Sequence, residues 1–119
     1  MLACLSKWQI PVLVFSGGIG NVLEYVLENS NCRYPNMTVV SNFLDFNSQG
    51  LVTGFKGPLI HVFNKTSKTL RQCRPEYLEK LRDRKHVILM GDSLGDIAMA
   101  DGIEDLQSVL KIGFLNTNV

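Results

Sequence analysis

Short apolar runs recur along the chain, separated by glycine-rich or polar segments. Helices are expected between these runs, at about 21–29, at 75–82 where Pro75 suits a first helical turn, and at 97–100. Strands that alternate with helices indicate a parallel sheet with helices on both faces. The four runs that we assign to strands are residues 12–15, 38–41, 87–90 and 111–115.

One segment departs from this alternation. Residues 43–55 contain apolar positions on either side of the polar, glycine-containing stretch 47–50, which predicts a β-hairpin. No repeat, low-complexity tract or linker divides the 119 residues, so we expect a single α/β domain.

Charge and cysteine content narrow the class of protein. Twelve basic and eleven acidic side chains give a formal net charge of +1, which provides no long-range field for nucleic acid or an anionic membrane. The three cysteines are widely spaced and form no Cys-x-x-Cys pair, which favours a reduced, cytoplasmic protein. The apolar start is interrupted by Lys7 and Pro11 and is too short to span a bilayer. We therefore expect neither a nucleic-acid partner nor a membrane.

The first candidate site follows the run at 12–15. Ser16 and Gly17 open the segment Ser-Gly-Gly-Ile-Gly, which predicts a tight turn leading into a helix. Backbone N–H groups in such a turn, with the helix N-terminus behind them, can bind a phosphate, and the Ser16 hydroxyl can add a hydrogen bond. The alternative is that Ser16 only caps the helix. A dinucleotide fingerprint is excluded, because Leu23 stands where the third glycine belongs.

The second candidate site is the segment 88–96, an apolar run that passes through Gly-Asp-Ser-Leu-Gly-Asp into a helix. Asp92 and Asp96 are four residues apart, which predicts that they share one face of the first helical turn. Two carboxylates there suit Mg²⁺, which takes oxygen ligands and often shares them with a phosphate. The alternative is that both acids only stabilise the helix N-terminus.

The same segment also spells a serine hydrolase motif. Gly-x-Ser-x-Gly around Ser93 matches a nucleophile elbow, and Gly-Asp-Ser-Leu matches a serine esterase signature. Such an enzyme needs a histidine beside the serine, and His61 and His86 are available. His86 begins the strand that leads to Ser93 and is expected at the opposite end of that strand. In esterases with this signature an Asp-x-x-His spacing follows the serine, whereas here Asp83 and His86 precede it. The esterase therefore remains a minor alternative.

Lys65 is the third candidate. A lone lysine after an apolar pair usually lies in solvent, and it gains a role only beside Ser16 and Asp92, where it could neutralise charge on a phosphoryl group.

The order of these three elements resembles motifs two, three and four of the haloacid dehalogenase superfamily. The closer resemblance is to the cytosolic 5′-nucleotidases of type III, which comprise the pyrimidine 5′-nucleotidases and a relative that acts on 7-methylguanosine monophosphate. It extends over most of residues 10–119. The resembling segments are 14–20, 39–46, 54–65, 91–96, 99–102 and 110–116.

The resemblance implies a three-layer α/β/α, Rossmann-like parallel sheet with the hairpin as an insertion. It implies a Mg²⁺-dependent hydrolase of nucleoside 5′-monophosphates, with pyrimidine or 7-methylguanosine nucleotides as substrates. Ser16, the Gly17 backbone and Lys65 would bind the substrate phosphate, and Asp92 would ligate Mg²⁺. Asp96 would hydrogen-bond Lys65, Ser16 or a metal-bound water.

One part of the family pattern is missing. Members carry Asp-x-Asp-x-Thr near the N-terminus, whose first aspartate forms an aspartyl-phosphate and whose second is the general acid and base. No two aspartates here stand two residues apart, and the helical cap that recognises the base is also absent. We therefore expect residues 1–119 to form one partial core domain whose partner is the missing N-terminal half of the same fold. Alone it should be poorly stable and inactive, or a remnant that binds phosphate or metal without turnover.

Overall fold

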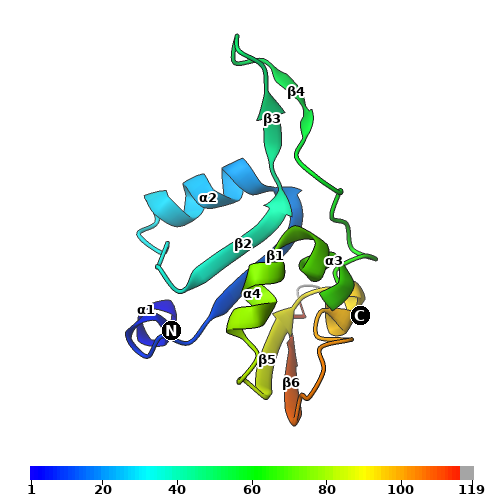
Figure 1. The fold of residues 1–119 in the computed structure, drawn as a ribbon. Coiled ribbons are helices and arrows are strands. Elements are labelled where there is room, and N and C mark those ends of the chain that lie inside the picture. The colour runs from blue at the N-terminus through cyan, green and yellow to red at the C-terminus, as the bar shows by residue number, and fades with distance from the viewer. Residues whose placement is uncertain (116–119) are drawn as a thin grey trace. The chain divides into compact units, whose positions relative to one another are not determined.

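The computed structural model describes residues 1–115. The chain folds into two compact units, Met1–His61 and Val62–Val119, which we call the N-terminal and C-terminal units and describe separately. Asn116, the end of the last resembling segment, lies outside the described residues. The elements in chain order are α1 (Leu2–Lys7), β1 (Val12–Ile19), α2 (Gly20–Asn29), β2 (Met37–Asn42), β3 (Leu44–Phe46), β4 (Val52–Phe55), α3 (Ser67–Cys73), α4 (Pro75–Lys80), β5 (His86–Gly91), the 3₁₀ helix η1 (Leu94–Ala98) and β6 (Ser108–Gly113) (Figure 1).

The N-terminal unit is built on the parallel pair β1–β2. The register runs from Val12 opposite Met37 to Phe15 opposite Val40, and α2 connects the two strands and packs against both. Strand β2 is buried at every position except Thr38, as expected of an apolar run covered by a crossover helix. Arg33 ties the helix to this strand, because it pairs with Glu24 of α2 at 2.6 Å and donates to the Met37 carbonyl at 2.9 Å.

The glycine-rich segment after Phe15 is not the tight turn that its sequence predicts. Strand β1 continues to Ile19, and its register against β2 shifts, so that Ile19 lies opposite Asn42. Three residues of β1 therefore face the single residue Ser41, which is a bulge. Helix α2 begins directly at Gly20, where a Cβ would lie 2.7 Å from the Phe43 ring.

Strands β3 and β4 form the predicted hairpin. They pair antiparallel, with Leu44 opposite Phe55, and in Figure 1 they project away from the end of β2. The Asn47 side chain organises the turn, because its Oδ1 accepts the N–H groups of Gln49 at 2.9 Å and Leu51 at 3.0 Å. Gly50 supplies the positive φ of 78° that the turn requires.

The C-terminal unit contains a second parallel pair. Strands β5 and β6 pair in register from His86 opposite Ser108 to Gly91 opposite Gly113 and lie side by side in Figure 1. The buried hydrophobic residues of this unit include Leu70 on α3, Tyr77 on α4 and Leu89 on β5. Helix α3 begins at the N-cap Thr66, whose side chain accepts the Thr69 N–H at 3.4 Å, and α4 has Pro75 in its first turn.

The structure confirms the mixed α/β class, the parallel pairing and three of the four assigned strands. The fourth, assigned to 111–115, is β6 at Ser108–Gly113, which begins three residues earlier and ends two earlier. Backbone hydrogen bonds within residues 1–115 join the strands in three separate pairs, where the pattern predicts one sheet. Helix α4 ends at Lys80, before the expected Arg82, and the helix expected at 97–100 is the earlier η1. The prediction from sequence missed α1 and α3. No helix in the described part of the chain has the length and apolar character needed to cross a membrane.

Candidate active site

Asp96 is the centre of a polar cluster that follows β5. Its side chain is buried, and its Oδ1 accepts from Lys65 Nζ at 2.7 Å in an ion pair. Its Oδ2 accepts the N–H of Asp92 at 3.2 Å, the N–H of Ser93 at 3.1 Å and the Ser93 hydroxyl at 3.0 Å. Both carboxylate oxygens have donors, which is the condition for burying a charge at tolerable cost.

Two glycines allow the chain to fold around this carboxylate. A Cβ at Gly91 would overlap the Asp96 side chain, and one at Gly95 would overlap the backbone of Val62. Ser93 is the N-cap of η1 and forms a capping box with Asp96 at the third position. The predicted pairing of both acids on one helical face is therefore wrong, because Asp92 precedes a 3₁₀ helix and Asp96 turns back to cap it.

Opposing effects set the pKa of Asp96. Burial of the carboxylate raises the pKa, but the hydrogen bonds from Lys65 and Ser93, with the positive charge of Lys65, outweigh burial and lower it below the ordinary value. Asp96 is therefore ionised at neutral pH. Lys65 is not the solvated lysine that its local sequence suggests, because its side chain is only 13% exposed and is held by this carboxylate.

The fit of the cluster to a divalent cation depends on Asp92. Asp96 is buried with donors on both oxygens, whereas Asp92 is exposed, so a hydrated Mg²⁺ would approach the segment at Asp92. Within residues 1–115, no group of three or more His, Cys, Asp or Glu side chains is placed to hold a metal. A cation at Asp92 would therefore draw most of its ligands from other groups, such as water or a bound phosphate, which is usual for Mg²⁺.

Ser16 and Gly17 belong to the N-terminal unit and lie in the β1 bulge. The Ser16 Oγ accepts the Gly18 N–H at 3.1 Å, which leaves its own proton for another acceptor. Ser16 does not cap α2, because the N-cap residue is Ile19. The structure thus brings Lys65, Ser93 and Asp96 together with the backbone of Asp92, while convergence of this group with Ser16 and Gly17 stays a prediction.

Two polar residues of β2, Ser41 and Asn42, also belong to the bulge and were missed. The Ser41 hydroxyl donates to the Gly18 carbonyl at 2.7 Å, and the Asn42 amide donates to the Gly17 carbonyl at 2.9 Å. The available signal was their position, since two polar residues ending an apolar strand need buried partners.

The serine esterase alternative gains no support. The Ser93 hydroxyl donates to Asp96, and His86 lies at the other end of β5, where its Nδ1 is 2.8 Å from Ser108 Oγ. A nucleophilic serine needs its proton directed to a histidine, and the proton of Ser93 is directed to a carboxylate that caps a helix.

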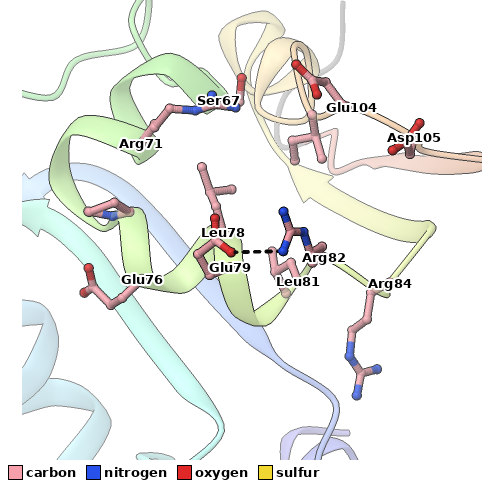
Figure 2. Close-up of a pocket in the computed structure, with 12 residues that line it drawn as sticks. Ser67, Arg71, Glu76, Leu78, Glu79, Leu81, Arg82, Arg84, Glu104 and Asp105 are labelled. Carbon is pink, nitrogen blue, oxygen red and sulfur yellow. Dashed lines mark ion pairs between the residues drawn. The ribbon is translucent and has the colours of Figure 1, made fainter.

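A separate cavity of about 650 Å³ lies between α3, α4 and residues 103–105 (Figure 2). Its lining includes Arg71, Arg82 and Arg84 together with four carboxylates, and Glu79 and Arg82 form an exposed ion pair at 3.9 Å. None of the predicted site residues lines this cavity, so it is distinct from the Asp96 cluster.

Comparison with known proteins identifies the family of this chain. A model of the pyrimidine 5′-nucleotidase (UMPH-1) family matches residues 1–119, the full sequence. The chain belongs to this family.

Curated relatives agree with the assignment to the UMPH-1 family. The 7-methylguanosine phosphate-specific 5′-nucleotidase of Gallus gallus is 45% identical over 115 residues, which are 97% of this chain and 39% of the relative. The enzyme of that name from Homo sapiens is 46% identical over 111 residues, 93% of this chain and 36% of the relative. This chain therefore spans about two fifths of the length of these relatives.

A solved structure is similar as well. The crystal structure of cytosolic 5′-nucleotidase IIIB bound to cytidine matches with a TM-score of 0.87 at 46% identity, over 94% of this chain and 37% of that one. The family resemblance of the sequence is thus confirmed.

Proposed function

We propose that this chain supplies the phosphate-binding and metal-binding part of a Mg²⁺-dependent 5′-nucleotidase, within a three-layer core of the haloacid dehalogenase type. Membership of the UMPH-1 family supports the reaction class. The observation that carries the site assignment is the buried Lys65–Asp96 pair, because its geometry gives a nearly buried lysine a fixed position beside Asp92. The substrate is a nucleoside 5′-monophosphate with a pyrimidine or 7-methylguanine base.

Each residue has one role in this proposal. The Ser16 hydroxyl and the Gly17 backbone hold the phosphate, and Lys65 holds it from another side. An ammonium has three donors, of which Asp96 takes one, so Lys65 can donate to phosphate oxygens while it stays anchored. Asp92 would hold Mg²⁺, which when bound would screen the phosphoryl charge and orient the group for in-line attack.

The attacking carboxylate is not among these residues. The reaction forms a bond from an aspartate oxygen to phosphorus and breaks the bond to the 5′ oxygen, which leaves with a proton as the nucleoside. Water then hydrolyses the aspartyl-phosphate. Because the sequence lacks Asp-x-Asp, we assign both aspartates to a segment outside the 119 residues. The same absence supports a second candidate, in which this chain alone binds phosphate and metal without turnover.

The test is release of phosphate from CMP and from 7-methylguanosine monophosphate, with and without Mg²⁺. The chain is assayed alone and joined behind the preceding part of the Gallus gallus relative. We expect activity only in the joined form, lost with EDTA and restored by Mg²⁺. Asp92→Asn should abolish the restoration, whereas Asp101→Asn, which removes an exposed acid nearby, should preserve it.

Three outcomes would contradict the proposal. Turnover by the chain alone would show that one of its own residues attacks phosphorus. Activity that is indifferent to EDTA would remove the metal from the reaction. Labelling of Ser93 by a fluorophosphonate would support the serine esterase alternative instead.

A further inference from the structure

The β1 bulge is held by side chains where a regular ladder would use the backbone. Between the pairs Phe15–Val40 and Ile19–Asn42, three residues of β1 lie opposite only Ser41. The carbonyls of Gly17 and Gly18 accept from Asn42 Nδ2 and Ser41 Oγ, at 2.9 and 2.7 Å. Both β2 side chains are 8% exposed, so these contacts are shielded from water.

Asn42 also joins the bulge to a second segment. Its Nδ2 donates to the Ile60 carbonyl at 2.8 Å, and its Oδ1 accepts the Ile60 N–H at 2.7 Å. A Cβ at Gly17 would lie 3.3 Å from the same Ile60 carbonyl, so glycine lets the bulge approach this segment closely. The Asn42 carboxamide thus makes three hydrogen bonds and uses both of its N–H donors.

Only a carboxamide satisfies this environment. Aspartate would keep the acceptor for the Ile60 N–H but would set an anionic oxygen against the carbonyls of Gly17 and Ile60. Alanine would leave all three backbone groups without their partner in a buried place, which costs more than the hydrogen bonds contribute.

We propose that Asn42 is a positioning residue, which fixes the Ser16–Gly18 bulge in the shape that receives phosphate. The inference rests on the proposed function of Ser16 and Gly17. Asn42 acts through them, since its donors are already used within the fold. The Gly18 N–H bonds to Ser16 Oγ, so the direction of the Ser16 proton depends on the bulge that Asn42 holds. Binding groups must be held within a fraction of an ångström to act on a ligand.

The test titrates the complete chain with inorganic phosphate. Binding is measured from the shifts of the amide resonances of residues 16–18 in ¹⁵N NMR spectra. Asn42→Asp should weaken phosphate binding ~10-fold or more, which corresponds to about 1.4 kcal/mol. The matched control is Asn36→Ala, which removes another strand-clamping carboxamide, bonded to the Ile10 carbonyl at 2.7 Å at the opposite end of β1. It should change phosphate affinity less than ~2-fold.

A milder variant covers the case in which Asn42→Asp does not fold. Ser41→Ala removes only the bond to Gly18 and should weaken phosphate binding ~3-fold. In the joined enzyme of the preceding experiment, both variants should raise KM for CMP more than they lower kcat. A merely structural role would lower stability and leave phosphate affinity and KM unchanged.

The outcomes separate the two proposals. If phosphate shifts the resonances of Ser16 and Gly17 in the unmodified chain but binds the Asn42 and Ser41 variants equally well, the positioning role is overturned and the phosphate site stands. If phosphate leaves those resonances unmoved in the unmodified chain, both proposals are overturned.

Discussion

The two parallel strand pairs share a topology but differ in how they are buried. Strand β2 of the N-terminal pair is buried at five of its six positions, whereas β5 has only Leu89 buried and β6 has none. Strand β1, like β5, has a single buried position, Phe15, so the difference lies in β2, against which α2 packs. One face of the second pair stays exposed and apolar, with Ile88 opposite Leu110 and Met90 opposite Ile112. Strand pairing alone therefore does not create a core.

The segments that end β2 and follow β5 also differ in the polar groups that they bury. Around β2 the buried polar side chains Ser41 and Asn42 are neutral, and backbone groups satisfy them. After β5 the buried polar group is charged, and Asp96 depends on the single cation of Lys65. Loss of one partner should therefore cost much more in the C-terminal unit.

The largest effect that we expect tests this contrast. Asp96→Asn removes the charge that pairs with Lys65 and should lower the free energy of unfolding by about 3 kcal/mol, because it leaves a nearly buried ammonium uncompensated. Urea denaturation of the purified chain measures the change. Glu79→Gln breaks the exposed pair with Arg82 and should cost less than about 0.5 kcal/mol. Equal effects of the two substitutions would show that Lys65 and Asp96 are solvated like a surface pair.

The sequence could predict the strands because each is a short apolar run. It could not predict α3, because that helix is polar apart from Leu70 and Cys73 and also buries Ser67 and Thr69. The glycines after Phe15 are equally compatible with a turn or a bulge. The choice depends on Ser41 and Asn42, more than twenty residues away, whose side chains hold the bulged strand.

The candidate site could likewise be predicted only in part from the sequence. Asp92 and Asp96 could be found from local spacing, although the spacing predicted the wrong geometry. Lys65 gave no local signal, because its partner lies 31 residues further along the chain. The family resemblance offered that pairing as one of three alternatives for Asp96, since a long-range contact leaves no periodic pattern in a single sequence.

A second, smaller effect should distinguish the strand pair β1–β2 from the more exposed pair β5–β6. Val40 of β2 is 3% exposed and Leu110 of β6 is 57% exposed. Val40→Ala should therefore cost about 2 kcal/mol of unfolding free energy, from lost burial and the cavity that remains. Leu110→Ala should cost less than about 0.5 kcal/mol, although it removes more of the side chain. A larger cost for Leu110→Ala would mean that the β5–β6 face is covered in solution.

The smallest effect that we expect concerns Tyr77, a buried ring of the C-terminal unit, and the dependence of stability on pH. Tyr77 of α4 is 6% exposed, and burial raises its pKa to about 12, against a smaller lowering by the charge of Arg84. Between about pH 10 and 12 the unfolded chain should lose the Tyr77 proton while the folded chain keeps it. The folded state should then lose about 1.4 kcal/mol of stability per pH unit, and below pH 10 the contribution is fully present.

Absorbance of the phenolate at high pH, combined with urea denaturation at pH 9 and pH 11, measures this loss. Tyr77→Phe should flatten the decline in stability, because phenylalanine has no proton to lose. Tyr25→Phe is the control. Tyr25 is 68% exposed on α2, so its removal should leave the decline in stability caused by Tyr77 in place. If stability falls as steeply without the Tyr77 hydroxyl, the α4 ring is not a buried anchor. The C-terminal unit would then lack both a covered strand pair and a helical core.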